Sequence, residues 1–147
     1  LKLGNQIAIM EGGRIVQAGP GEAIVTRPAT AYVKDFVANV NPLRVLTAAS
    51  VMQPLEAWPA TIEIGRGRLR LEGEAGAVRA ALDGEPLVVG DLDGAVTGGL
   101  LCCPVETPLK RLVEAAELGP ARFLVTAADG RPLGLVFERQ LFRAFLR

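Results

Sequence analysis

The chain has 147 residues, half of them hydrophobic, which is enough to build one ordinary domain or two small ones. Lys and Arg together number 16, as do Asp and Glu, and the resulting formal net charge of zero argues against a general nucleic-acid-binding protein, which would carry a basic excess. Histidine is absent and the two cysteines, Cys102 and Cys103, are adjacent, so we expect neither a metal site nor a catalytic centre.

The first predicted element is a β-hairpin over residues 7–19. Two apolar runs flank Gly12 and Gly13, a pattern typical of two short strands joined by a tight turn. An isolated hairpin is at best marginally stable in water, so we expect another element to cover it and the chain to be part of a larger protein. The motif I-A-I-M-x-x-G-x-I-x-Q-x-G resembles the last β-hairpin of the nucleotide-binding subunit of ABC importers.

Two helices are predicted after this hairpin, over residues 22–26 and 29–40. The first ends before Pro28, because the residue before a proline avoids the helical region. The second has an apolar face at helical spacing, which we expect to pack in the core. This face consists of Tyr32, Val33, Phe36, Val37 and Val40. The pattern P-A-x-x-Y-V-x-x-F-V resembles the end of the ABC ATPase domain.

Alternating apolar and charged residues predict a second hairpin over residues 60–72, with its turn at residues 65–67. On a strand, Arg66, Arg68 and Arg70 would share one face. Such a row of arginines suits a phosphate, a cyclic dinucleotide or an anionic lipid headgroup. The alternative is a solvated strand face whose arginines are balanced by neighbouring glutamates.

The rest of the chain contains a weak internal repeat of a helix, a strand, a turn and a strand that begins with glycine. In the first copy the three regular elements are predicted at residues 75–82, 86–89 and 94–97. In the second copy they are predicted at residues 108–118, 122–126 and 134–137, with a turn at Asp129 and Gly130.

The second copy carries the clearer signals. Thr107 is suited to be the N-cap of its helix, with Pro108 at the first helical position. Leu141, Phe142 and Phe145 are predicted to lie on one face of a helix that closes the chain. The pattern P-L-x-x-L-V-E-x-A…F-L-V-x-x-x-D-G-x-P-L-G-L-V resembles a cystathionine-β-synthase (CBS) motif, and two such motifs normally pair into one module.

An ABC ATPase tail followed by a CBS pair resembles the ATP-binding subunit of glycine betaine/proline (quaternary amine) importers. This resemblance implies an α/β (α+β) fold, in which a tandem CBS module follows a remnant β-hairpin and helix of the ATPase domain. It implies that residues 1–42 are the remnant, residues 43–101 a degenerate first CBS motif and residues 102–147 the second. It also implies a homodimer, permease subunits as partners, a cytoplasmic position at the inner (plasma) membrane, and a regulatory role in osmoprotectant transport.

The motifs of ATP hydrolysis are missing from this sequence. It contains no G-x-x-x-x-G-K-[ST] phosphate loop, so we expect this chain not to hydrolyse ATP, whereas its parent subunit would bind ATP and Mg²⁺. Its apolar runs are shorter than the roughly 20 residues of a membrane-spanning helix, so we expect no membrane span.

Adenosine-binding CBS modules often carry G-h-h-T/S-x-x-D, in which the hydroxyl meets phosphate and the aspartate accepts from ribose. In the first copy Thr97 keeps the hydroxyl, but Leu100 stands where the aspartate is expected. In the second copy Phe137 replaces the hydroxyl and Gln140 replaces the aspartate. Thr97 and Gln140 are therefore incomplete candidates for binding an adenine nucleotide or cyclic di-AMP, and sensing of such a ligand is the alternative function.

Overall fold

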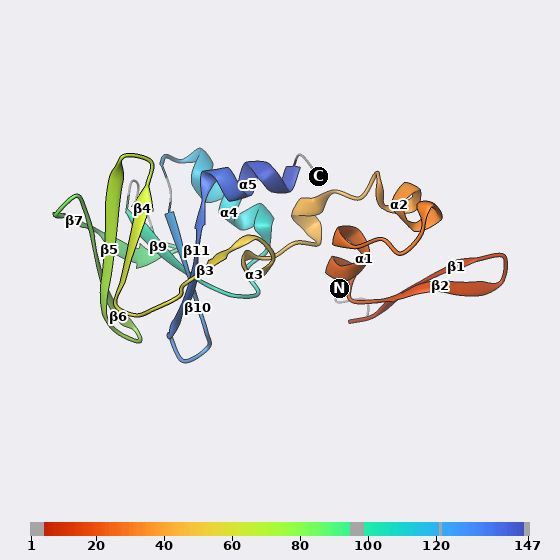
Figure 1. Cartoon of the computed structure of the whole chain (residues 1–147), viewed down its shortest axis with the longest axis horizontal. Coiled ribbons are helices and arrows are strands. Elements are labelled where there is room, and N and C mark those ends of the chain that lie inside the picture. Colours follow the sequence, from red (N-terminus) through yellow and green to blue (C-terminus); the bar gives the residue numbers. More distant parts are fainter. Residues whose placement is uncertain (1–4, 95–98, 121, 146–147) are drawn as a thin grey trace. The chain divides into compact units, whose positions relative to one another are not determined.

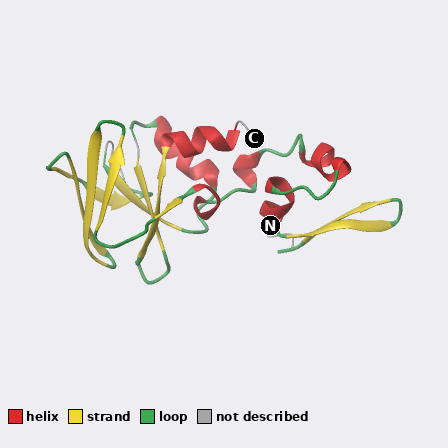
Figure 2. Ribbon diagram, viewed as in Figure 1, coloured by secondary structure: helices red, strands yellow, loops and turns green. Residues whose placement is uncertain are grey.

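The protein is a mixed α+β chain, as predicted, and its computed structural model describes residues 5–94, 99–120 and 122–145 (Figures 1 and 2). The chain divides into two compact units, Leu1–Leu46 and Thr47–Arg147. We call them the N-terminal unit and the C-terminal unit and describe each by itself.

The N-terminal unit consists of a hairpin and short helices. Its elements are β1 (Ile7–Glu11), β2 (Arg14–Gly19), α1 (Gly21–Thr26), α2 (Ala31–Val37) and the 3₁₀ helix η1 (Pro42–Arg44). Strands β1 and β2 pair antiparallel, which confirms the predicted hairpin. Gly12 and Gly13 form its turn with φ angles of 56° and 78°, a region that favours glycine. The core of this unit is a cluster of Ile9, Ile24 and Val33.

Helix α2 is shorter than predicted, and its apolar face is narrower. The Thr30 hydroxyl caps it by accepting a hydrogen bond from the Val33 amide at 3.2 Å. Val33 is buried, but Tyr32 and Phe36 are 39% and 59% exposed, so their predicted place in the core is wrong within this chain. The reason is geometric: each lies about 100° around the helix from the residue that follows it, and only Val33 and Val37 reach the hairpin cluster.

The C-terminal unit contains two sheets and three helices among its described residues. Its elements, in chain order, are α3 (Ala48–Val51), β3 (Gln53–Pro54), β4 (Ala60–Ile64), β5 (Gly67–Glu74), β6 (Ala77–Leu82), β7 (Glu85–Leu87), β8 (Val89–Asp91), β9 (Leu100–Pro104), α4 (Leu109–Glu117), β10 (Arg122–Thr126), β11 (Pro132–Phe137) and α5 (Glu138–Phe145). One sheet has the order β3-β11-β10-β9-β8, in which β8, β9 and β10 are parallel. The other is the antiparallel meander β4-β5-β6-β7.

The two sheets pack face to face around a shared apolar core. Leu69 and Leu71 of β5 are fully buried and cluster with Leu100, Leu124 and Leu135 of the other sheet. The helices α3, α4 and α5 lie on the side of the five-stranded sheet away from the meander (Figure 2). The C-terminal unit is therefore layered as helices, mixed sheet and meander.

The helix predicted for the first repeat copy is wrong, because residues 77–82 form strand β6. This strand pairs with β5 on one side and β7 on the other, so its backbone hydrogen bonds are made within the sheet. Ala80 is buried and Arg79 is exposed, as the alternation of a strand requires. The strand predicted at residues 86–89 is divided between β7 and β8, which belong to different sheets. The tandem arrangement of two CBS motifs is thus not confirmed.

The second repeat copy forms with the predicted order of elements. Helix α4 and strands β10 and β11 fall within two residues of the predicted ranges, and Gly130 supplies the turn with a φ angle of 83°. The predicted cap differs: Pro108 precedes the helix, and Thr107 is buried, with its carbonyl accepting from the Ala48 amide at 2.8 Å.

The face predicted for the closing helix is also different. Leu141 of α5 is buried, whereas Phe142 is 64% exposed, because adjacent residues of a helix point about 100° apart. The side chain of Phe145 lies outside the described residues.

Candidate functional site

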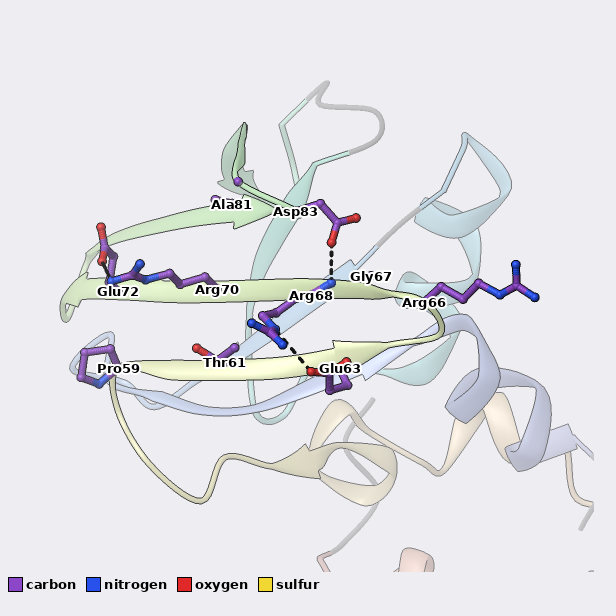
Figure 3. A pocket seen from close by; sticks show the side chains of 11 residues that line it. Pro59, Thr61, Glu63, Arg66, Gly67, Arg68, Arg70, Glu72, Ala81 and Asp83 are labelled. Carbon is purple, nitrogen blue, oxygen red and sulfur yellow. Dashed lines mark hydrogen bonds and ion pairs between the residues drawn. The ribbon is translucent and has the colours of Figure 1, made fainter.

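The predicted arginine site lies on the exposed face of the meander, which we call the charged face (Figure 3). Thr61 and Glu63 of β4 lie opposite Arg70 and Arg68 of β5 in the strand register. Their apolar neighbours in sequence point into the core, so the polar side chains are directed outward by simple alternation. The charged face lines an open hollow of about 840 Å³.

Two of the three predicted arginines are paired with carboxylates. The Arg68 Nε lies 3.3 Å from Glu63 Oε1 on the neighbouring strand. Glu72 receives two arginines, with Arg70 at 3.5 Å and Arg79 at 3.4 Å. The arginines and Glu63 are exposed and Glu72 is partly exposed, so each ion pair contributes at most about 1 kcal/mol and is weakened by salt.

Arg66 lines the same hollow but is set apart from the other two arginines. It lies in the turn before β5 begins, and its side chain points away from Arg68 and Arg70 (Figure 3). The prediction that all three share one strand face is therefore wrong. The hollow is also lined by Asp83, whose carboxylate accepts from the Arg68 amide at 2.7 Å. Because its arginines are matched in number by carboxylates, the charged face fits the solvated-face alternative better than an anion site.

Of the two predicted nucleotide residues, Gln140 lies within the part of the chain that the structure describes. Gln140 accepts a hydrogen bond from the Phe137 amide through Oε1 at 3.0 Å. This contact caps the first turn of α5, where the backbone N–H groups lack helical partners. Thr97 lies outside the described residues.

The two cysteines have raised pKa values that suppress their reactivity. Burial raises the pKa of the Cys103 thiol to about 12, against a smaller lowering by its hydrogen bond with Thr107. Burial also raises the pKa of Cys102, and the negative charge of Asp91 adds to the effect. Both thiols are therefore protonated at neutral pH and poorly suited to nucleophilic or metal chemistry. Within the described ranges, no group of three or more Cys, Asp or Glu side chains is placed to hold a metal ion.

A feature that the sequence did not predict is a groove between α4 and α5, which we call the α4–α5 groove. It has a volume of about 340 Å³. It is lined by Val113, Ala116, Glu117, Glu138, Leu141 and Phe142. The signal in the sequence was the adjacent pair Leu141 and Phe142, of which a short helix can bury only one.

The part of the chain that the structure describes contains no helix long and apolar enough to cross a membrane.

The chain is similar to transport ATP-binding proteins. The glycine betaine/proline betaine transport system ATP-binding protein ProV of Escherichia coli is 26% identical over the whole chain, which spans 42% of ProV. The glycine betaine transport ATP-binding protein OpuAA of Bacillus subtilis is 39% identical over 46% of the chain and 15% of its own length. The spermidine/putrescine import ATP-binding protein PotA 1 of Pseudomonas aeruginosa is 32% identical over 73% of the chain and 28% of its own length.

The chain thus spans less than half of each of these relatives. No protein-family model matches the chain, and no solved structure matches it significantly. The relatives are ATP-binding subunits of transport systems, which supports the resemblance to the ATP-binding subunits of ABC importers.

Proposed function

We propose that this chain is the C-terminal part of the ATP-binding subunit of an ABC importer for an osmoprotectant such as glycine betaine or proline. In this proposal the C-terminal unit is a regulatory and assembly module rather than a catalytic one. The observation that carries the proposal is the similarity to ProV, which extends over both units of the chain at once.

The compactness of the C-terminal unit supports a regulatory role. Its two sheets share a core that is separate from the hairpin cluster of the N-terminal unit, so it can move or associate as a body. In the intact importer, two ATPase subunits would lie beneath the permease in the cytoplasm, with ATP and Mg²⁺ bound in the region before this chain. A paired C-terminal unit would bias the equilibrium between open and closed ATPases if it bound one of these states more tightly.

The test is deletion of residues 47–147 from the intact subunit, followed by reconstitution with its permease in proteoliposomes. We expect the deletion to leave ATP hydrolysis in place but to change its dependence on salt and to alter betaine or proline uptake. Unchanged ATPase activity and transport at every ionic strength would exclude the regulatory role. The matched control is Glu56→Gln, a surface change in the same unit that should leave regulation intact.

The alternative, sensing of an adenine nucleotide or cyclic di-AMP, is separated from this proposal by a thermal-shift panel on the 147-residue chain. A ligand that binds the folded state at about 100 times its Kd would add about 2.7 kcal/mol to the free energy of unfolding. Because Gln140 caps a helix and Arg68 and Arg70 are paired, we expect no shift with ATP, AMP or cyclic di-AMP at millimolar concentration. A clear shift would establish the sensing function instead.

A further inference from the structure

We propose that the α4–α5 groove is a docking site for a basic, amphipathic helix of a partner protein. The inference does not depend on the function proposed above, because it rests on the side chains that line the groove and on their places in the two helices. It names the partner by two properties: an apolar stripe that fills the groove, and lysine or arginine side chains beside that stripe.

The floor of the groove is apolar and partly open. Val113 and Ala116 come from α4, and Leu141 and Phe142 come from α5. Phe142 is 64% exposed, although it borders a groove that already holds apolar side chains. A single exposed phenylalanine is ordinary, but one placed at the edge of an apolar groove is suited to anchor a partner.

The charged side chains that line the groove are both acidic. They are Glu117, the last residue of α4, and Glu138, the first residue of α5. Two nearby cations have partners that do not line the groove: Lys110 pairs with Glu114 at 3.6 Å, and Arg139 donates to Gln53 at 3.2 Å. The rim therefore attracts a cationic segment, and it repels both an acidic segment and the same rim of a second copy.

The position of Glu117 adds an independent argument. A helix carries partial negative charge at its C-terminal end, so a carboxylate there is unfavourable and a cation is favourable. The last turn of α4 contains no lysine or arginine to offset Glu117. Glu138 is different, since an acidic residue in the first turn of α5 is favoured by the helix itself. A cation from a partner would compensate Glu117 in a way that the chain's own α4 does not.

The test is a titration of the 147-residue chain into a fluorescently labelled peptide, read by fluorescence anisotropy. The probe is made of leucine and lysine and is about 18 residues long, enough to form a helix, with leucine at i, i+3, i+4 and i+7. We expect saturable binding that weakens as salt is raised from about 50 mM to about 500 mM. A peptide with glutamate in place of every lysine, and one with the same composition in scrambled order, should not bind.

Variants of the chain locate the binding. The double change Glu117→Gln with Glu138→Gln should weaken binding about tenfold at low salt and remove most of its salt dependence. Phe142→Ala should weaken it at least about tenfold at any salt. The control Glu114→Gln, on the same helix but outside the groove, should leave the affinity within about twofold. Far-UV circular dichroism and thermal melts confirm that each variant is folded.

Three results would overturn the proposal. The first is that the basic peptide fails to bind the folded chain. The second is that its affinity is the same for the double glutamine variant, for Phe142→Ala and for Glu114→Gln. The third is that sedimentation shows self-association of the chain and that Phe142→Ala abolishes this association. The last result would assign the groove to a second copy of the chain.

Discussion

Gln140 stands where the resemblance to adenosine-binding CBS modules predicted an aspartate, and its side chain has a structural task instead. Its Oε1 accepts a hydrogen bond from the backbone N–H of Phe137 at 3.0 Å. This N–H is one of those that a helix leaves without an internal partner at its start. A ligand hydroxyl at this position would have to compete with that hydrogen bond. The observed contact of Gln140 is thus that of a helix-capping residue at the start of α5.

Cys102 and Cys103 show how two adjacent residues of one strand acquire different surroundings. Successive side chains of β9 point to opposite faces of the sheet, so Cys103 is buried under the helical layer while Cys102 lies half-buried beside Asp91. Burial raises the pKa of both thiols, and at Cys102 the negative charge of Asp91 adds to this effect.

The raised pKa of Cys103 leads us to expect that the protein loses stability at high pH. Its folded-state pKa of about 12 lies above the value of about 9 expected when unfolded, so the unfolded chain releases this proton first. The contribution of Cys103 is complete below pH 9 and is lost as the pH rises towards 12, by up to about 1.4 kcal/mol per pH unit. Urea unfolding between pH 7.5 and about 10.5 measures this slope.

The control for this prediction is Cys103→Ala, which removes the thiol but keeps a small apolar side chain. It should lower the free energy of unfolding at pH 7.5 and flatten the decline above pH 9 relative to the unaltered chain. Equal slopes for the two proteins would mean that the Cys103 thiol does not govern the alkaline instability.

At the scale of elements, the hairpin of β4 and β5 was predictable because its signals are local. Apolar and charged residues alternate along each strand, and Gly65 supplies the turn with a φ angle of 61°. The same alternation decides which residues face the core and which form the charged face. The sequence predicts that glutamates balance these arginines. Which glutamate pairs with which arginine depends on the strand register.

Two neighbouring residues of β5 test whether one face of this strand is buried in the core and the other exposed. Leu71 is fully buried, so Leu71→Ala should lower the free energy of unfolding by about 2–5 kcal/mol. Arg70 is exposed, so Arg70→Ala should change it by no more than about 1 kcal/mol. Chemical denaturation of the two variants gives the comparison. A cost at Arg70 similar to that at Leu71 would show that the charged face is covered by another surface.

Residues 75–82 show where local signals are insufficient. Their alanines favour a helix, yet residues 77–82 form β6 because β5 on one side and β7 on the other offer backbone hydrogen-bond partners. Short glycine turns, with Gly76 at φ 78° and Gly84 at φ 87°, bring these strands together. Pairing with neighbouring strands, rather than the helix propensity of the segment, therefore makes residues 77–82 a strand.

At the scale of the whole molecule, the two units differ in how much core they possess. The hairpin cluster of the N-terminal unit is small, whereas both faces of the five-stranded sheet in the C-terminal unit are covered. A hairpin with little apolar cover is marginally stable on its own.

This difference predicts that residues 47–147 fold as a separate protein. That fragment should unfold cooperatively in a thermal melt, with a midpoint close to that of the main transition of the full chain. A peptide of residues 1–46 should have little regular structure by circular dichroism in isolation. If instead the fragment 47–147 failed to fold, the C-terminal unit would depend on the hairpin and helices that precede it.

The turns, the amphipathic segments, the mixed α+β class and the similarity to transport ATP-binding subunits can all be read from the sequence, because these are properties of short stretches or of the residues themselves. Three other features follow from the folded arrangement: residues 77–82 pair as a strand, Arg66 is separated from Arg68 and Arg70, and Phe142 borders a groove with two glutamates. The reason is that strand pairing and the packing of one helix against another bring together residues far apart in the chain, and no local pattern records which of them will meet.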